Sequence, residues 1–376
     1  MKIFFISHSS VIPTYREKLR LLCARKDVDL TLFLPKAWPE AGQRARPLPQ
    51  TKEKEGFRII TAPILFEGRV KRHFYPFLFR HIKAFQPDLI HVEEEPYSLV
   101  AWQAARAAER LGSKFVFFTW ENLLERFEFP HQHIRDYVLS RTDHAIAGDQ
   151  EADQLLQKAG YPAKKISVIP QYGVDPKLFR KKDASKLKKK LGLGAFTIGY
   201  VGRLVPEKGI HTLLEAFSQL DKPRSKLLLV GNGPLRQELA EKAKDLGIGG
   251  DTLFVPAMGQ DKLPGYLSCL DVLVLPSLTT PKWKEQFGRV IIEAQACGVP
   301  VLGSDSGAIP EVIGKAGLIF KEGSVPDLVK SLKKLGDSAS LRKKLSGLGH
   351  RQVLKLYTNQ KIADQIYRVY QKVLSE

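Results

Sequence analysis

Short apolar runs alternate with amphipathic helical patterns along most of this chain, and this alternation limits the fold more than any other feature. Strands that alternate with helices are typical of a parallel sheet covered by helices. In the first half we predict strands at residues 3–6, 30–34, 58–62, 89–92, 115–119, 144–147 and 166–169. The helices of this half are predicted near residues 15–24, 74–85, 98–111 and 149–158.

The alternation stops at the Pro- and Gly-punctuated segment 170–176 and then restarts. The second set of strands is predicted at residues 196–201, 226–230, 252–255, 272–275 and 301–303. We therefore predict an α/β fold of two doubly wound, Rossmann-like domains, with a ligand site in the cleft between them, beyond the strands' carboxyl ends. The domains are assigned to residues 1–172 and 173–354, and residues 355–376 to a last helix that can pack back on the first domain.

The chain has 376 residues and a formal charge of +19, so an anionic partner is expected: nucleic acid, an anionic membrane or a phosphorylated small molecule. Its three cysteines are far apart, as in ordinary thiols of a reducing compartment. No apolar run approaches the roughly 20 residues of a membrane span, and the apolar run near Met1 is too short for a signal core. We expect a cytoplasmic protein that can attach to the inner face of a membrane.

Two carboxylates, Glu285 and Glu293, stand eight residues apart around the apolar start of a predicted helix. A helix that only packed against a core would not favour an acid inside its apolar run. Free backbone N–H groups near Phe287 and Gly288 could hold a phosphate, with one acid on either side of it. Such a site suits a ligand with hydroxyls at both ends and phosphate in the middle, as in a nucleotide sugar.

The predicted strand 196–201 leads into a turn that carries Arg203 and Lys208 between Gly202 and Gly209. Two cations on a strand-to-helix turn can clamp a diphosphate from two directions, and the helix N-terminus adds positive potential. The alternative, two solvated surface cations, is disfavoured by their place at a strand's carboxyl end. Gly233 belongs to a similar turn, where glycine permits close approach of a ligand or simply a tight turn.

These segments occur in the order and spacing of a known family. They are Gly202-Arg203, Lys208-Gly209, Gly231 with Gly233, Pro276-Ser277, Glu285 with Phe287-Gly288, Glu293-Ala294 and Gly298 with Pro300-Val301. The chain resembles the retaining glycosyltransferases of family 4, which have the two-domain GT-B architecture. The likeness covers nearly the whole C-terminal half. In the N-terminal half it rests on the strand–helix rhythm and on the linker Tyr172–Asp175.

The resemblance implies roles for the matched residues. Arg203 and Lys208 would bind the diphosphate and stabilise the departing nucleotide. Glu293 would bind the ribose hydroxyls, and Glu285 would hold and orient the transferred sugar. Amides around Phe287 and Gly288 would meet the phosphates.

Other positions of the C-terminal half complete the implied donor site. Gly202 and Gly233 would allow the donor to approach the backbone, and Ala257 and Met258 would lie beside the base. The acceptor implied is a glycan or a lipid-linked molecule, bound by the N-terminal domain in the synthesis of a cell-envelope glycan.

No metal is expected in this chemistry, because fixed cations and helix-end amides can stabilise the leaving diphosphate. One Asp-x-Asp pair exists, Asp27 with Asp29, and it is read mainly as a helix-to-strand turn rather than as a metal site. Glu285 and Glu293 could also be a glycosidase-type pair, if both reached one anomeric carbon. Arg203 and Lys208 favour a phosphate-containing donor instead.

The N-terminal half departs from the family at two places. Where many members have a glycine-rich turn after the first strand, this chain has a polar segment in which His8 and Arg16 are either acceptor-side residues or structural ones. Where many have a histidine after the fifth strand, Glu121 and Asn122 follow Trp120. Glu121 could act as a general base and Asn122 could orient a hydroxyl. The alternative is a buried tryptophan with polar neighbours.

Three further acids, residues 93–95, follow another strand at the same edge, and at least one is expected to be solvated or to cap a helix. The basic and aromatic segment 69–83 could lie on an anionic bilayer or form a core helix with its cations in water. The basic amphipathic stretch 177–191 is read as a solvated helix face. Two rival functions are a sugar phosphorylase of the same architecture and nucleic-acid binding. The second is not expected, because no recognition module is visible and the charge is dispersed.

Overall fold

The computed structural model describes residues 1–39, 46–47, 55–123, 127–221 and 225–376. The chain forms two compact units. Unit 1 consists of residues 1–172 together with 359–376, and unit 2 consists of residues 173–358. The last helix therefore belongs to unit 1, and unit 2 extends to Thr358 rather than ending at the predicted residue 354.

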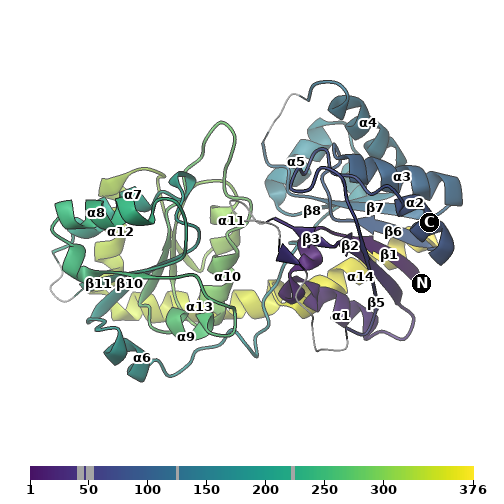
Figure 1. The fold of residues 1–376 in the computed structure, drawn as a ribbon. Coiled ribbons are helices and arrows are strands. Elements are labelled where there is room, and N and C mark those ends of the chain that lie inside the picture. The colour runs from purple at the N-terminus through teal and green to yellow at the C-terminus, as the bar shows by residue number, and fades with distance from the viewer. Residues whose placement is uncertain (40–45, 48–54, 124–126, 222–224) are drawn as a thin grey trace. The chain divides into compact units, whose positions relative to one another are not determined.

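Unit 1 is built on a seven-stranded parallel sheet in the order β5-β2-β1-β6-β7-β8-β9 (Figure 1). Its strands are β1 (Lys2–Ile6), β2 (Asp29–Pro35), β5 (Arg58–Ala62), β6 (Leu89–Val92), β7 (Lys114–Thr119), β8 (His144–Ala147) and β9 (Ile166–Val168). A separate antiparallel pair joins β3 (Ala37–Trp38) to β4 (Arg46–Pro47). The central strands β1 and β6 are largely apolar because helices cover both faces of the sheet.

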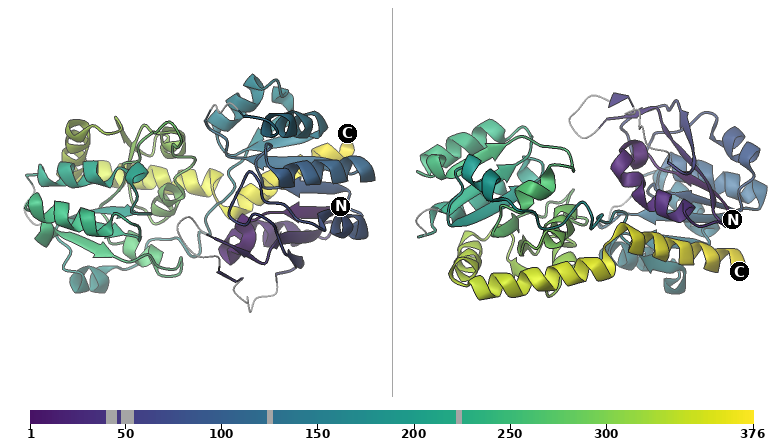
Figure 2. Two further views of the ribbon diagram at one scale, coloured as in Figure 1. Left: turned by 45° about the horizontal axis from the view of Figure 1, so that its top comes forward. Right: turned by 90° about the horizontal axis from the view of Figure 1, so that it is seen from below.

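The two faces of this sheet have separate cores, since successive residues of a strand point to opposite sides. Phe4 and Ile6 of β1 pack on one side with α2 (Leu78–Phe85), α3 (Leu99–Leu111), α4 (His131–Arg141) and α5 (Gln150–Lys158). Ile3 and Phe5 pack on the other side with α1 (Glu17–Cys23) and α14 (Asn359–Ser375). Helices α1 and α14 lie side by side on that face (Figure 2).

Unit 2 has a six-stranded parallel sheet in the order β12-β11-β10-β13-β14-β15. Its strands are β10 (Phe196–Val201), β11 (Ser225–Val230), β12 (Thr252–Val255), β13 (Val272–Leu275), β14 (Val301–Ser304) and β15 (Gly317–Phe320). The chain runs outward from β10 to one edge, then returns to β13 and runs to the other. In sheets of this kind a ligand binds beyond the carboxyl ends of the strands at such a reversal.

The helices of unit 2 connect these strands. They are α6 (Ser185–Lys190), α7 (Ile210–Ser218), α8 (Arg236–Asp245), α9 (Leu263–Leu267), α10 (Arg289–Ala296), α11 (Ile309–Ile313), α12 (Val325–Asp337) and α13 (Ala339–Leu356). Helix α7 packs against α8 and α12, and α10 packs against α9, α11 and α13. None of the helices in the described parts of the chain is both long and apolar enough to cross a membrane.

The predicted α/β fold of two doubly wound domains is confirmed, and each predicted strand is present with both ends within one residue of its predicted position. Strand β15 was not predicted; it is an edge strand without clear alternation, and Ile319 is 38% exposed. The last helix, predicted for residues 355–376, begins at Asn359, because Tyr357 and Thr358 separate α14 from α13. Helix α2 begins at Leu78 rather than at 74, since Pro76 disfavours helical backbone before it.

A buried hydrogen bond joins α14 to the sheet of unit 1, and its removal tests how much it stabilises the core. A hydrogen bond of 2.6 Å joins the Tyr370 hydroxyl to Nδ1 of His91, and both side chains are fully buried. Changing Tyr370 to Phe leaves that nitrogen without its partner, so we expect a loss of about 1–3 kcal/mol in the free energy of unfolding. Urea denaturation measures it. Tyr367→Phe on the same helix removes an exposed bond to Asp27 and serves as the control. Equal losses in both variants would contradict the role given to Tyr370.

Candidate functional site

The turn after β10 holds two cations at the point where the strand order of unit 2 reverses. The Tyr200 hydroxyl donates a 2.6 Å hydrogen bond to the carbonyl of Arg203 and so fixes the start of the turn. At the other end Gly209 has φ +63°, and a Cβ there would lie 2.0 Å from the carbonyl oxygen of Pro276. Only glycine fits this position. The turn therefore brings Lys208 against the loop that follows β13.

Lys208 and Glu285, predicted from sequence as a phosphate ligand and a sugar ligand, form a direct ion pair. The Lys208 Nζ lies 2.6 Å from Oε2 of Glu285, and the Ser277 hydroxyl donates to the same oxygen at 2.7 Å. Ser277 is fully buried, and its carbonyl accepts a 2.6 Å bond from the Ser304 hydroxyl. The loops after β10 and β13 thus meet at one carboxylate, and the end of β14 supports the position of Ser277.

The ion pair is enclosed on two further sides. The Lys208 ammonium lies 4.6 Å from the ring centroid of Trp283, within reach of a cation–π interaction. The backbone carbonyl of Glu285 accepts a 3.0 Å bond from the amide of Ala308. Gly307, with φ +52°, is placed so that a Cβ would lie 2.0 Å from that carbonyl oxygen. Gly307 and Ser277 were not predicted as site residues.

Arg203 is less constrained than Lys208. Its side chain is 48% exposed and lies 3.3 Å from the carboxylate of Glu207, one turn along. An exposed ion pair of this kind contributes little to stability, so the guanidinium can leave Glu207 for an anionic ligand at small cost.

Glu293 is buried in α10, as its place in an apolar run suggested. Its carboxylate lies 2.9 Å from Nε of Arg289, one turn earlier on the same helix. Burial raises the pKa of Glu293 above its usual value, although the Arg289 guanidinium opposes the shift. Gly288 precedes α10 with φ +70°, no side chain caps the helix there, and the ring of Phe287 packs against Tyr357.

The remaining predicted donor residues follow β10, β11 and β12 at the same edge of the sheet. The amide of Gly202 donates to the Val230 carbonyl at 3.0 Å, which ties the ends of β10 and β11 together. Gly233 lies in the loop that follows β11, and Ala257 donates through its amide to the side chain of neighbouring Asn232 at 3.3 Å. Ala257 is exposed and Met258 half-buried. The carboxyl edge of unit 2 therefore carries all of the predicted donor residues.

In unit 1 the acceptor-side candidates fall into two groups. Nδ1 of His8 lies 2.7 Å from the Glu94 carboxylate, in the loop after β1. Arg16 is buried, and its guanidinium donates to the Ser10 carbonyl at 2.7 Å and to Glu55 at 2.9 Å. These contacts favour the structural interpretation of Arg16.

Glu121 and Asn122 follow β7 and are largely buried. The Glu121 amide donates to the Thr119 hydroxyl at 2.9 Å, and its carboxylate lies 3.9 Å from Arg135 of α4. The buried-tryptophan alternative is partly realised, because Trp120 is half-buried and its indole N–H donates to Gln171 at 2.8 Å.

The expectation that at least one of the three acids after β6 is solvated or caps a helix is wrong. Glu93 and Glu94 are buried, and Glu93 pairs with Lys18 and accepts a 2.9 Å bond from the Ser7 hydroxyl. The carboxyl of Glu95 is enclosed, and it accepts from the Thr119 hydroxyl and from the Trp120 amide at 3.0 Å. Protein groups thus contact each of these acids, although Oε2 of Glu94 has no hydrogen-bond partner among the described residues.

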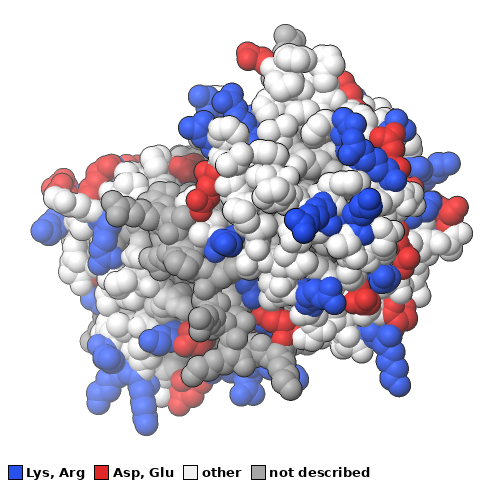
Figure 3. All heavy atoms as spheres, turned by 45° about the vertical axis from the view of Figure 1, so that its right-hand side comes forward, with Lys and Arg blue, Asp and Glu red and all other residues white. Residues whose placement is uncertain are grey.

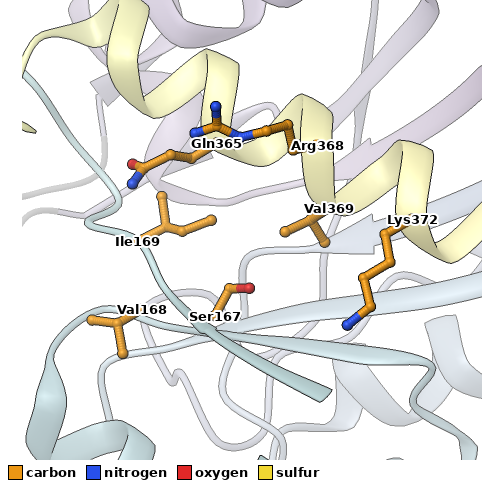
Figure 4. Close-up of a pocket in the computed structure, with 7 residues that line it drawn as sticks. All are labelled: Ser167, Val168, Ile169, Gln365, Arg368, Val369 and Lys372. Atoms are coloured by element: carbon orange, nitrogen blue, oxygen red, sulfur yellow. The ribbon is translucent and has the colours of Figure 1, made fainter. Parts of the chain in front are cut away.

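A pocket of about 340 Å³ lies elsewhere in unit 1, between the edge strand β9 and α14 (Figure 4). Ile169 and Val369 form its apolar part, while Arg368 and Lys372 add positive charge. None of the predicted site residues lines it. It lies beside β9, at the edge of the sheet.

The enclosed carboxyl of Glu95 makes the stability of unit 1 depend on pH. Burial, together with the charges of Glu121 and Glu94, raises the pKa of Glu95 from 4.5 to about 8, although the hydrogen bonds from Thr119 and Trp120 oppose the shift. Between these values the folded protein keeps a proton that the unfolded chain has lost. Stability from this group is therefore complete below pH 4.5 and is lost as pH rises through 8.

We expect Glu95→Gln to remove this loss. Wild type should lose at most roughly 5 kcal/mol more than the variant between pH 5 and 8.5. Urea denaturation at both values measures the difference. Parallel pH dependence of the two proteins would contradict the buried, protonated Glu95.

Comparison with known proteins agrees with this arrangement. The sequence profile described as "Glycosyl transferases group 1" matches residues 181–351, and the profile "Glycosyltransferase Family 4" matches residues 17–178. The Bacillus anthracis N-acetyl-alpha-D-glucosaminyl L-malate synthase is 29% identical over 64% of this chain and 60% of its own length. A D-inositol 3-phosphate glycosyltransferase of Actinosynnema mirum is 32% identical over 57% of this chain and 54% of its own length. The matched segment thus spans little more than half of each relative.

Solved structures share the fold over nearly the full chain. Anabaena HepE, crystallised in complex with UDP, superposes with a TM-score of 0.80 over 99% of this chain and 100% of its own, at 20% identity. A glycosyltransferase from Rickettsia africae superposes with a TM-score of 0.79 over 99% of this chain and 98% of its own, at 18% identity. The two sequence profiles, one in each half, together with this fold show that the chain belongs to the family-4 glycosyltransferases of GT-B architecture.

Proposed function

We propose that this protein is a retaining glycosyltransferase that moves a sugar from a nucleotide-sugar donor to a glycan or lipid-linked acceptor, without a metal ion at the diphosphate. The Lys208–Glu285 ion pair carries the proposal, because it places a cation beside a hydrogen-bonding carboxylate at the strand-order reversal of unit 2. The names of the relatives add support, since the Actinosynnema mirum relative is described as a glycosyltransferase and HepE was crystallised with UDP.

Each charged residue of the proposed donor site has a separate role. Lys208 and Arg203 neutralise the negative charge that develops on the leaving diphosphate, and backbone amides at the start of α10 add to this field. Glu285, already oriented by Lys208 and Ser277, accepts hydrogen bonds from the hydroxyls of the sugar. Glu293 accepts them from the ribose. The Lys208 ammonium is held at its carboxylate before the donor arrives, so little reorganisation is needed during bond cleavage.

The proposed acceptor site belongs to unit 1. Glu121 replaces the histidine that many family members carry after this strand, and we assign it the removal of the acceptor's proton. Its carboxylate lies 3.9 Å from a guanidinium nitrogen of Arg135 in α4. Asn122 then orients an acceptor hydroxyl, and His8 stands at the neighbouring end of β1.

Removal of single donor-site charges should affect transfer much more than folding. We expect Lys208→Ala and Glu293→Gln each to lower kcat about 10²–10³-fold, because each removes a group that contacts the reacting donor. Released nucleoside diphosphate measures turnover with the active nucleotide sugar, and circular dichroism checks the fold. Lys330→Ala, at an exposed lysine of α12, is the matched control. Near-normal turnover in either site variant would refute the donor assignment.

Donor binding should not need a divalent cation. Lys208, Arg203 and the amides at the start of α10 supply the positive field that Mg²⁺ provides in other sites. We expect isothermal titration to give the same donor affinity in EDTA and in MgCl₂. Loss of binding in EDTA with recovery on addition of Mg²⁺ would contradict this proposal.

We also propose that unit 1 attaches to an anionic membrane surface. The segment of residues 65–83, here called the aromatic–basic segment, exposes Phe66 at 56% and Phe77 at 61%. Exposed cations lie between its aromatic residues, namely Arg69, Arg72, Arg80 and Lys83. Single rings can enter the interface while the cations meet lipid phosphates. The core-helix alternative is only partly realised, since just Leu78, Ile82 and Phe85 of α2 are buried.

Other cations do not gather into a nucleic-acid groove on the face shown in Figure 3, where Lys and Arg are dispersed among Asp and Glu.

Flotation with liposomes tests the membrane proposal. At low salt we expect wild type to float with vesicles of anionic lipid and to stay unbound with neutral lipid. The double variant Phe66→Ser, Phe77→Ser should lose most of this binding, whereas Leu354→Ser, at an exposed leucine of unit 2, should not. Absence of wild-type flotation at low salt would exclude the proposal.

A further inference from the structure

Three metal-ligating side chains meet at the carboxyl edge of the unit 1 sheet, outside the donor site. His8 follows β1 and Glu94 follows β6, and these two strands are neighbours in the sheet. His73 comes from the aromatic–basic segment, just before α2. The topology therefore joins three segments that lie far apart in the sequence, which we call the His8–His73–Glu94 cluster.

The donor atoms of the cluster are spaced as ligands of one ion. Oε1 of Glu94 lies 2.7 Å from Nδ1 of His8 and 3.5 Å from Nε2 of His73. One ligand atom from each residue lies within 4.8 Å of the other two. Nitrogen and oxygen ligands bound to Zn²⁺ at roughly 2.0–2.2 Å are themselves roughly 3–3.5 Å apart in a tetrahedral site. Small shifts of these side chains would complete such a site.

The orientation of His73 supports a cation. Its Nδ1 lies 3.2 Å from the carbonyl oxygen of Arg69 and 3.1 Å from that of Val70. Carbonyl oxygens only accept hydrogen bonds, so Nδ1 carries a proton. A backbone carbonyl on one ring nitrogen is the usual arrangement of a metal-binding histidine, and it leaves the other nitrogen to the metal.

Two buried atoms of the cluster have no hydrogen-bond partner among the described residues: Nε2 of His73 and Oε2 of Glu94. Both side chains are fully buried. With Nδ1 protonated, a neutral His73 turns the lone pair of Nε2 toward a carboxylate, which is unfavourable unless a positive charge lies between them. A proton or a metal ion can supply that charge.

The residues around the cluster limit which cation it can bind. The Glu94 carboxylate lies between the two imidazoles. Trp38 packs against both imidazoles, with ring centroids 4.3 Å from His8 and 4.8 Å from His73. The His8 side chain is 21% exposed and gives a path from solvent. Two imidazoles and one carboxylate suit Zn²⁺ and its neighbours better than Mg²⁺ or Ca²⁺.

We propose that the His8–His73–Glu94 cluster binds one divalent transition-metal ion of the Zn²⁺ type, which ties the aromatic–basic segment to the ends of β1 and β6. The site is empty in this structure. The ion would stabilise unit 1 and would take no part in the metal-free diphosphate chemistry of unit 2. The proposal does not rest on the proposed sugar transfer, and its test reads metal content rather than activity.

The test uses the full chain after treatment with EDTA and dialysis. Titration with Co²⁺ should give visible d–d absorption that saturates at one ion per chain, and Zn²⁺ should displace it. Addition of Zn²⁺ should raise Tm, and the affinity should fall as pH falls, since protons compete for the imidazoles.

Variants locate the ion. Glu94→Gln, His8→Gln and His73→Gln should each weaken binding at least about 10-fold. His211→Gln, at a partly exposed histidine of unit 2, should bind as wild type does. Because His73 is buried, circular dichroism checks its fold, and the partly exposed His8 gives an independent answer. The proposal is overturned if wild type binds no more Co²⁺ than Glu94→Gln, as expected for a purely proton-sharing cluster, or if His211→Gln loses binding equally.

Discussion

The ion pair between Lys208 and Glu285 is the interaction on which the proposed donor site depends. It joins the loop after β10 to the loop after β13, and Ser277 and Ser304 extend it to the end of β14. A buried pair of this kind is weak evidence for stability, because desolvation of two charges offsets much of their attraction. The pair matters here because it fixes the positions of a cation and a carboxylate at the strand-order reversal, where a doubly wound sheet binds its ligand.

Unit 1 also holds buried charged groups at the carboxyl edge of its sheet, but these groups have different kinds of partner. Three consecutive acids follow β6, and each is satisfied differently. Glu93 pairs with Lys18, Glu94 faces two histidines, and Glu95 accepts from Thr119 and the Trp120 amide. Burial alone would raise the pKa of both Glu94 and Glu95, but the two histidines lower that of Glu94 to about 2, whereas burial prevails at Glu95 and its pKa rises to about 8. The carboxyl edge of unit 1 therefore carries acids in different charge states.

Much of the fold could be predicted because its signals are local. Fully buried parallel strands appear as short apolar runs, and each of the predicted runs became a strand. Strand β15 was not predicted although Gly317–Phe320 is a short apolar run; at the edge of the sheet only its Phe320 is buried. The break at Tyr357 was not predicted because helical periodicity continues on both sides of it. Glu285, Glu293, Arg203 and Lys208 were predicted because charges inside apolar or glycine-framed segments are conspicuous.

The rest of the candidate sites depends on contacts between distant segments. Nothing near Ser277 indicates that its hydroxyl will bind the carboxylate of Glu285, although Pro276-Ser277 was part of the recognised pattern. The need for glycine at position 307 arises from the close approach of the Glu285 backbone, which only the folded structure shows. His73 read as one cation in a basic, aromatic segment, and only the fold places it beside His8 and Glu94. The sequence around each of these positions does not show which distant residue it contacts, and that contact gives the residue its role.

The central claim is that the carboxyl edge of unit 2 binds the diphosphate of a nucleotide sugar. Hydrogen–deuterium exchange, with a panel of UDP, GDP and ADP and their sugars, tests it most directly. The account predicts that at least one of these ligands slows exchange in the peptides covering Gly202–Gly209 and Glu285–Glu293, and that Lys208→Ala abolishes this protection. Protection confined to other segments, or none with any member of the panel, would contradict it.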